Sequence, residues 1–370
     1  MSFYPFQMEQ LMSEWEKTVD YNLSESGVHP LSFRELVDDS AQLEELLNNG
    51  LDYSQTNGTV ALRESICGLY PGSTPDNVLV TSGAAVANFL AVWTLFQPGD
   101  ELVLMLPNYM QIWGIAKNLG IPVRPFHLRE EDGWAPDLDE LQSVVSERTR
   151  AIAVCNPNNP TGRILTEPEM DAIATAADRV GAWILSDEVY AGAERLTDEE
   201  TQSFWGRHDK VLVQQSLSKA YGLPGLRIGW VITQPELRDK LWRRQEYTVI
   251  CPSCLSDQLA QIALSPEKRP AILRRTRDYI RRGYPVLQEW LESHGDIFSL
   301  VPPQAAAIAF VRYNLEVNSS EAVDRLLREQ SVLVVPGDHF GLDHHLRISF
   351  GLPHDYLRSG LDRVGRLVAF

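Results

Sequence analysis

The chain has 370 residues, which is long enough to bury a large core, and this length favours two domains or one large and one small domain. Its formal net charge of −17 would repel a phosphate backbone, so we expect no nucleic-acid partner. No run of about 18 apolar residues occurs, and the first residues lack the pattern of a signal peptide. We therefore expect no membrane partner and a cytoplasmic location.

The N-terminal arm places Leu11, Trp15 and Val19 at helical spacing, which indicates a packing face. From about Asn77, short apolar runs alternate with amphipathic stretches. Seven of these runs have the length and composition of strands: NVLVTSG, DELVLMLP, IPVRPF, RAIAVCNP, AWILSDE, KVLVQQSLS and RIGWVIT. Their alternation with helices predicts an α/β fold in which a mostly parallel, seven-stranded sheet is sandwiched by helices. Ligands of such sheets bind at the carboxyl ends of the strands.

The pattern changes near Cys254. A long helical stretch, interrupted around Pro266 and Pro270, is followed by three strand-like runs: AAAIAFVRY, SVLVVPG and HLRISFG. We predict a large domain over residues 45–270. Residues 1–44 together with residues 271–370 are predicted to form a smaller α+β domain.

Four cysteines in a chain of this length fit reduced thiols better than a disulfide framework. Cys251 and Cys254 have the CxxC spacing, but a structural zinc site would need a second pair of ligands, which the sequence lacks. We therefore predict no metal. The cysteines are expected to pack in the protein, with redox chemistry as the alternative.

Polar punctuation at the strand ends supplies the candidate site residues. A strand, a glycine and a helix start in TSGAAVANF, so the backbone amides of Gly83, Ala84 and Ala85 can bind an anion at a helix N-terminus. The alternative is a simple glycine turn. Tyr109 follows the next run, where an aromatic ring either stacks on a flat ligand or packs at the rim of the core. Asn159, in the rigid turn CNPNNPTG, can present its amide to the same edge of the sheet or serve the turn alone.

Two further strand ends carry charged groups. Asp187, followed by Tyr190, ends a buried run, where a carboxylate needs a partner such as an arginine or a protonated ring nitrogen. The stretch QSLSKAYGLPGLRIGW then combines hydroxyl groups and an arginine, which suit a phosphate, with Lys219, which can form a Schiff base. Each signal alone is weak. All of them occur in order at consecutive strand ends, and this makes the joint interpretation much stronger.

From YSQTNGTVALRESI to LRISFG, the sequence resembles the class I/II aminotransferase family, within the fold-type I pyridoxal-phosphate enzymes. The elements that carry the resemblance are NPNNPTG, DEVY, SLSKAYGLPGLRIG and the C-terminal Arg347. They are specific for the fold and the cofactor, and less so for the reaction. The resemblance implies pyridoxal 5'-phosphate as the cofactor and a homodimer with shared active sites.

The resemblance also implies roles for individual residues. Lys219 would hold the cofactor as a Schiff base and move the proton at the substrate Cα, while Asp187 would pair with the ring nitrogen and Tyr109 would stack on the ring. Arg347 would clamp the substrate α-carboxylate. The phosphate would be held by Gly83, Ala84, Ala85, Ser216, Ser218, Arg227 and Tyr53 of a second subunit. Tyr190 and Asn159 would bond to the phenolic oxygen of the cofactor. Asn159 and Val28 would contact the substrate.

Two features leave the reaction open. Ala84 and Ala85 stand where many relatives carry a hydroxyl or amide side chain, so phosphate contacts there must come from the backbone. The segment NLSESGVHPLSF resembles the start of capreomycidine synthase-type enzymes, which use this fold for elimination and ring closure on an arginine derivative. The leading interpretation is an aminotransferase acting on an α-amino acid and a 2-oxo acid. The alternative is a lyase or cyclase on the same fold.

Two other classes fit poorly. An effector-binding domain of a transcription regulator would need a DNA-binding domain, and no helix-turn-helix is readable before Tyr53. A nicotinamide-dependent dehydrogenase would need GxGxxG spacing, which Gly222, Gly225 and Gly229 do not have.

Overall fold

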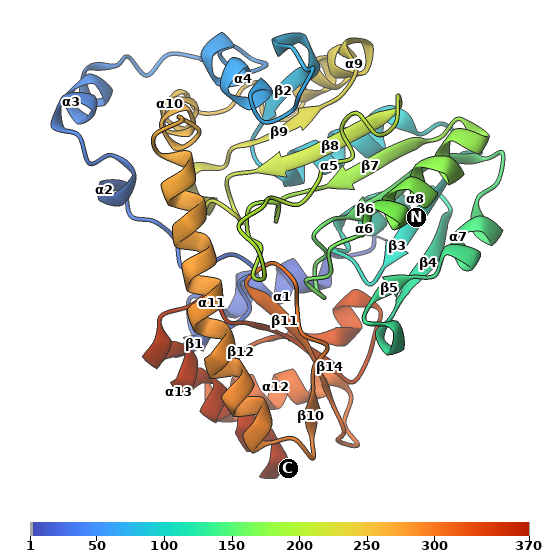
Figure 1. Cartoon of the computed structure of the whole chain (residues 1–370), viewed down its shortest axis with the longest axis vertical. Helices are drawn as coiled ribbons and strands as arrows, with labels where there is room; N and C mark the ends of the chain where they lie inside the picture. The colour runs from blue at the N-terminus through green and yellow to red at the C-terminus, as the bar shows by residue number, and fades with distance from the viewer. Residues whose placement is uncertain (1–2, 370) are drawn as a thin grey trace.

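The computed structural model describes residues 3–369. Its main sheet has the strand order β2-β9-β8-β7-β6-β3-β4-β5 (Figure 1). The strands are β2 Val78–Thr81, β3 Glu101–Leu106, β4 Val123–Arg129, β5 Ala135–Pro136, β6 Thr149–Cys155, β7 Trp183–Asp187, β8 Val211–Ser216 and β9 Gly229–Ile232. All seven predicted runs of the main sheet form strands, and β5 adds a two-residue extension that pairs with β4.

The central strands β4, β3, β6, β7 and β8 are parallel, whereas β9 runs antiparallel to both β8 and β2. This reversal follows from the connection between β8 and β9. Parallel neighbours need a crossover connection, usually a helix. Residues 217–228 contain only the short 3₁₀ turn Pro224–Leu226, so the chain folds back directly.

Helices cover the main sheet on both faces, as predicted. Leu102 and Leu104 of β3 belong to one buried cluster, while Val103 and Met105 belong to the other. This alternation follows the two-residue period of a strand. The helices of this part are α4 Val60–Cys67, α5 Ala84–Leu95, α6 Gln111–Asn118, α7 Leu138–Val144, α8 Glu167–Val180, α9 Pro235–Gln245 and α10 Cys254–Ala263.

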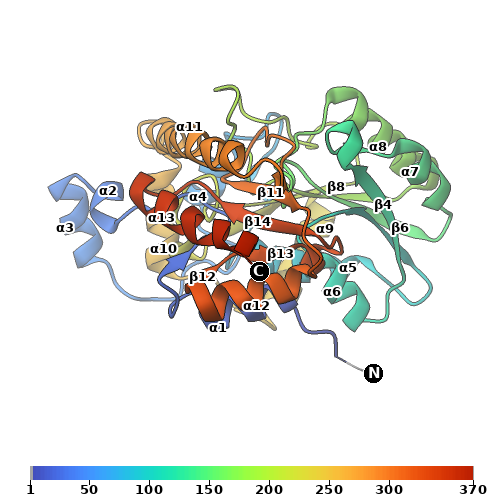
Figure 2. The same ribbon diagram turned by 90° about the horizontal axis from the view of Figure 1, so that it is seen from below.

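A smaller antiparallel sheet has the order β10-β11-β14-β13, with strands β10 Phe298–Ser299, β11 Ile308–Tyr313, β13 Val335–Pro336 and β14 His345–Ser349. The run SVLVVPG, expected as one strand, is divided. Its first part, β12 Val332–Leu333, pairs in parallel with β1 Tyr21–Asn22, and its second part, β13, pairs with β14. The N-terminal arm therefore adds a strand to the C-terminal part, next to α12 Ser319–Gln330 and α13 His354–Val364 (Figure 2).

The long helical stretch forms α10 and α11 Arg269–Ser293, and α11 runs from the main sheet to the small sheet (Figure 1). The break lies at residues 264–268. Pro270, expected to interrupt the helix, instead lies in its first turn, where the missing N–H costs no hydrogen bond. The remaining helices are α1 Gln7–Trp15, α2 Phe33–Leu36 and α3 Ser40–Asn48. In both views α2 and α3 project from the rest of the chain.

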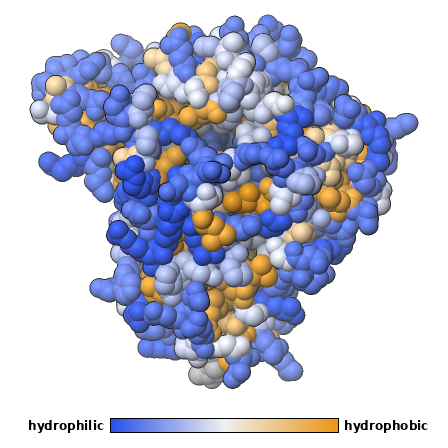
Figure 3. Space-filling model, viewed as in Figure 1, coloured by the Kyte–Doolittle hydropathy of each residue, from blue (hydrophilic) through white to orange (hydrophobic). Residues whose placement is uncertain are grey.

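The surface is mostly polar. Hydrophilic residues cover most of the face in Figure 3, and hydrophobic residues form separate small patches. Among the helices of residues 3–369, none combines the length and apolar composition that a bilayer crossing requires.

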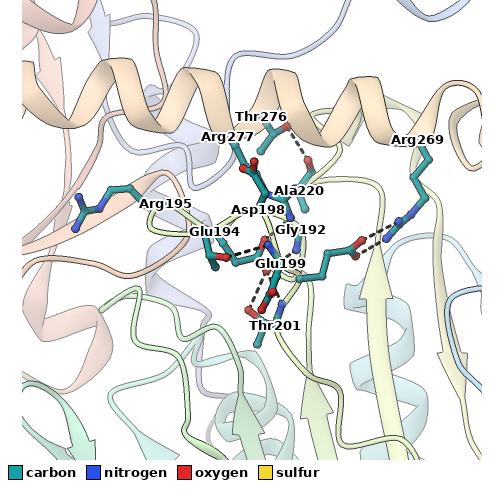
Figure 4. Close-up of polar contacts among 12 residues, drawn as sticks. Gly192, Glu194, Arg195, Asp198, Glu199, Thr201, Ala220, Arg269, Thr276 and Arg277 are labelled. Atoms are coloured by element: carbon teal, nitrogen blue, oxygen red, sulfur yellow. Dashed lines mark hydrogen bonds and ion pairs between the residues drawn. The ribbon is translucent and has the colours of Figure 1, made fainter.

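A buried polar network joins α11 to the loop that follows β7 (Figure 4). Arg277 Nη2 lies 2.8 Å from Glu194 Oε2, and the two side chains are 9% and 1% exposed. The other oxygen of Glu194 accepts hydrogen bonds from the amides of Gly192 and Thr201. Because neither charge reaches water, each depends on the other for its stabilisation.

We expect Glu194→Ala to lower the free energy of unfolding by about 3–5 kcal/mol, because it leaves the Arg277 charge buried without a partner. Urea unfolding followed by circular dichroism measures the loss. Asp324→Ala is the control, since its pair with Arg328 on α12 is solvent-exposed and contributes little. Equal losses for the two variants would contradict a structural role for the buried pair.

Candidate active site

A cavity of about 370 Å³ lies at the carboxyl ends of the main-sheet strands. It brings together most of the residues singled out by sequence: Ala84, Ala85, Tyr109, Asn159, Asp187, Tyr190, Ser216, Ser218, Lys219, Arg227 and Arg347. Three predicted residues are outside its described lining. Gly83 immediately precedes the lining residue Ala84, Tyr53 is 85% exposed, and Val28 is buried in the core beside Gly351.

One end of the cavity is built for an anion. Gly83 precedes α5 with a φ of 87°, and a Cβ placed there would lie 2.4 Å from Arg227 Nη2. Gly229 of β9 is equally constrained, because its Cβ would lie 2.6 Å from the amide nitrogen of Ala84. The amides of Ala84 and Ala85 are in the first helical turn, where no intrahelical acceptor is available. Helix dipole, free amides and guanidinium thus face the same point.

Asp187 ends β7 and is 6% exposed. Among residues 3–369, its oxygens accept only long hydrogen bonds, from the Val189 amide at 3.3 Å and from Asn88 Nδ2 at 3.5 Å. Burial raises the pKa of its carboxyl group to about 6. A cationic N–H donor in the cavity would therefore find a carboxylate with capacity to spare.

The neighbouring Glu188 points to the opposite side of the strand end, since side chains alternate along a strand. It accepts hydrogen bonds from Ser186 Oγ at 2.8 Å and from the Phe204 amide at 2.9 Å. Burial raises its pKa to about 7. Glu188 is held by the protein itself and is absent from the cavity lining, so Asp187 is the carboxylate of DEVY that faces a ligand.

Lys219 lies in the turn after β8 with its Nζ 3.8 Å from Glu25 Oε2. Gly27 packs against its backbone, since a Cβ at Gly27 would lie 3.7 Å from Lys219 Cα. Ala220, the next residue, is held by α11, because Thr276 Oγ1 donates to the Ala220 carbonyl at 2.7 Å (Figure 4). The backbone around Lys219 is thus held by Gly27 and α11, while the lysine amine faces the cavity.

Arg347 of β14 is 1% exposed, and burial lowers the pKa of its guanidinium. Its Nη1 donates to Asn159 Oδ1 at 3.1 Å, and its Nη2 donates to the Ser24 carbonyl. Its Nε has no hydrogen-bond partner among the described residues. A guanidinium remains charged in such a site, so Arg347 can receive an anion from the cavity.

Two tyrosines complete the lining. Tyr109 Oη donates to Glu9 Oε1 at 2.8 Å, and its ring meets Phe6 edge-on at 5.1 Å between centroids. Tyr190 is 1% exposed, and its hydroxyl lies near Ser26 but has no hydrogen bond that meets geometric criteria within residues 3–369. Burial raises the pKa of both phenols, so both remain neutral donors.

Sequence reasoning missed the contribution of the N-terminal arm to the cavity. Met8 and Met12 on α1 and Glu16 just after it recur every four residues, and they line the cavity together with Glu9 and Glu25. The signal was this second stripe on the arm. The first stripe, Leu11, Trp15 and Val19, packs against the core as predicted.

We expect the ligand-free chain to carry a pH-dependent penalty from Asp187. Its raised pKa means that the folded state binds the proton more tightly than the unfolded chain does, so stability falls as pH rises from 3.8 to about 6. Asp187→Asn should raise the free energy of unfolding by roughly 1–3 kcal/mol above this window, and by little below it. Unfolding curves at several pH values measure this difference. A pH-independent difference would contradict it, and the exposed Asp324→Asn is the control.

Known proteins are similar to this chain over nearly its whole length. The sequence profile "Aminotransferase class I and II" matches residues 29–364. Capreomycidine synthase of Streptomyces vinaceus is 31% identical, over 93% of this chain and 88% of that protein. The crystal structure of a PLP-dependent aminotransferase from Streptococcus suis has a TM-score of 0.93 and 31% identity, covering 100% and 98% of the two chains. The PLP-dependent cyclase OrfR has a TM-score of 0.89 and 26% identity, with the same coverage.

The cavity fits the cofactor of these proteins. The cradle at Gly83, which a Cβ would fill, suits a phosphate, and the weakly bonded Asp187 suits a protonated ring nitrogen. The buried hydroxyl of Tyr190 has a hydrogen bond to give, and the amine of Lys219 faces the same space. The chain belongs to the aminotransferase class I and II family, and its cofactor is pyridoxal phosphate.

Proposed function

We propose that the protein is an aminotransferase that moves an amino group between an α-amino acid and a 2-oxo acid. One observation carries the proposal: Asp187 at the end of β7, Lys219 in the turn after β8 and Arg347 within β14 line the same cavity. Transamination needs a base at the substrate Cα, a carboxylate that keeps the cofactor ring protonated and a cation for the substrate carboxylate. Each of the three residues can meet one of these needs.

The proposed binding residues divide between phosphate and ring. Ser216, Ser218, Arg227 and the amides at the start of α5 hold the phosphate. Tyr190 and Asn159 donate hydrogen bonds near the phenolic oxygen, and the Tyr109 ring lies against the cofactor face. When bound, pyridoxal phosphate supplies an aldehyde that condenses with amines and a ring that accepts electrons from the substrate Cα.

The protein's own groups then control the substrate. Arg347 holds the α-carboxylate through its guanidinium, which is fixed by Asn159 and Ser24. A substrate held in this way presents its Cα–H bond toward Lys219. Lys219 Nζ removes that proton and returns it, and the placement of a proton acceptor accounts for about 10²–10⁴ of the rate in such steps.

The second candidate is elimination or ring closure on an amino acid. It is favoured by Glu25, whose carboxylate lies 3.8 Å from Lys219 Nζ and could act as a second proton carrier beside the reacting lysine. It is also favoured by the similarity to capreomycidine synthase over 93% of this chain.

A labelling experiment separates the two reactions. With the holoenzyme, an amino acid labelled at nitrogen and an unlabelled 2-oxo acid, we expect the label in the new amino acid, measured by mass spectrometry. Lys219→Ala should lower this transfer by about 10²-fold or more, because the proton carrier at the substrate Cα is removed. Lys210→Ala is the matched control, since Lys210 Nζ donates to the Gly181 carbonyl outside the cavity.

Release of ammonia or of a β-leaving group, without consumption of the 2-oxo acid, would instead establish the elimination or cyclisation reaction. Absence of amino transfer and of both kinds of release with a broad panel of amino acids would contradict both candidates.

We also propose a homodimer with shared active sites. The projecting helix α3 has no buried residue, and Leu47 and Leu51 at its end are 71% and 78% exposed. Tyr53 follows them, with an exposed ring that its own chain does not bring to its cavity. Exposed leucines on this projecting segment favour its burial against a second copy of the chain. The cavity of that second copy would then receive Tyr53.

We expect sedimentation at twice the 41.7 kDa of one chain. The double variant Leu47→Glu/Leu51→Glu should weaken association of the two chains, because it places negative charges on the exposed apolar surface at the end of α3. Tyr53→Phe should leave the mass unchanged and weaken cofactor binding by a few-fold, since only one hydrogen bond is lost. A wild-type monomer at micromolar concentration would contradict the shared site.

A further inference from the structure

We infer that the substrate carries a positive charge on its side chain, as a guanidino or amino group. This inference rests on the proposed function and names its substrate class. It comes from the charges that remain in the cavity once each proposed role is filled. Arg227 serves the phosphate, Arg347 serves the α-carboxylate and Asp187 serves the ring nitrogen.

Three carboxylates of the lining then have no assigned partner in the reaction: Glu9, Glu16 and Glu25. Glu9 accepts the Tyr109 hydroxyl at 2.8 Å, which leaves its charge unneutralised. Glu16 lies 3.4 Å from Lys17 Nζ, but Lys17 is 84% exposed, and such a pair contributes little. Glu25 faces Lys219, whose proposed role requires an uncharged nitrogen, so it gains no permanent cation there.

Two buried polar groups of the same site have hydrogen-bonding capacity left for a ligand. Arg347 Nε and Tyr190 Oη lack hydrogen-bond partners among the described residues, and both residues are 1% exposed. Glu9 and Glu25 both act on the pKa of Arg347, which places them within electrostatic reach of the carboxylate position. Arg347 donates its own hydrogen bonds to Asn159 Oδ1 and the Ser24 carbonyl, and not to these carboxylates. A substrate anchored at Arg347 therefore lies in a cavity whose lining includes three carboxylates with no assigned partner.

The arm determines what the side chain meets. Met8 and Met12 lie on the face of α1 that lines the cavity, and Glu16 follows at the C-cap of the helix, so an apolar stretch leads to a carboxylate. A methylene chain that ends in a cation matches this order, because its stem packs on methionine and its head meets glutamate. A side chain with a carboxylate would meet three like charges. The arrangement therefore selects against acidic amino acids as well as for basic ones.

A pair of unreactive ligands tests the charge alone. 5-Guanidinopentanoate and 5-ureidopentanoate have the same length and shape but differ by one positive charge, and neither has an amino group that can react with the cofactor. Calorimetric titration of the holoenzyme should give at least about tenfold tighter binding of the guanidino compound, since a charge-assisted hydrogen bond contributes that much. Hexanedioate, which replaces the cation with a carboxylate, should bind least.

Variants of the three glutamates locate the effect. Glu16→Gln should reduce the preference for the guanidino compound by about threefold, and Glu9→Gln/Glu16→Gln/Glu25→Gln should bring it close to unity. Glu14→Gln is the matched control, because Glu14 is exposed on α1 and outside the cavity lining. A preference that survives the triple variant, or that Glu14→Gln reduces as much as Glu16→Gln does, would overturn the inference, since it would then reflect net charge alone.

The result is distinguishable from the outcome of the labelling experiment. Failure to transfer the amino group would remove the proposed reaction and leave the binding preference intact. Equal binding of the two compounds by an enzyme that transfers amino groups would overturn the substrate class and leave the reaction intact.

Discussion

The hydrogen bond from Arg347 Nη1 to Asn159 Oδ1 joins parts of the chain that are 188 residues apart. Arg347 comes from the small sheet and Asn159 from a loop of the main sheet, while the other Nη of Arg347 is held by the Ser24 carbonyl of the N-terminal arm. One buried guanidinium thus touches all three segments that enclose the cavity. Its desolvation is offset only if all of them are in place, so the closed site and the folded chain are coupled.

The same constraint explains the balance of charge in the site. Asp187 and Arg347 are buried, and each keeps unused hydrogen-bonding capacity toward the cavity. A protein that needed only stability would replace such groups with apolar ones. Retaining them costs stability in the ligand-free chain and prepares the positions that a charged ring and a carboxylate require. The glutamates of the arm line the same cavity and, under our proposal, extend this preparation to the rest of the substrate.

Contacts outside the cavity lining hold the turn that carries Lys219 in place. Ala220, the residue after Lys219, is held by Thr276 of α11, and α11 is itself fixed by the buried pair of Arg277 and Glu194. These residues carry no catalytic signature in the sequence, because a threonine and an ion pair on a helix look like ordinary polar positions. Their importance comes from burial, which depends on the packing of α11 against a loop about 80 residues earlier in the chain.

The sequence by itself determined the seven strands of the main sheet and the polar groups at their ends, because strand periodicity is local and parallel strands place their carboxyl ends at one edge. Strand-end chemistry for Lys219 and Asp187, and the family resemblance for Arg347, also singled out three residues that line one cavity. Only the tertiary structure decided that SVLVVPG is shared between two sheets and that Met8, Met12, Glu9 and Glu16 enclose the cavity. Helical spacing shows which residues share a face, but the partner of that face depends on contacts between the two ends of the chain, which no local pattern records.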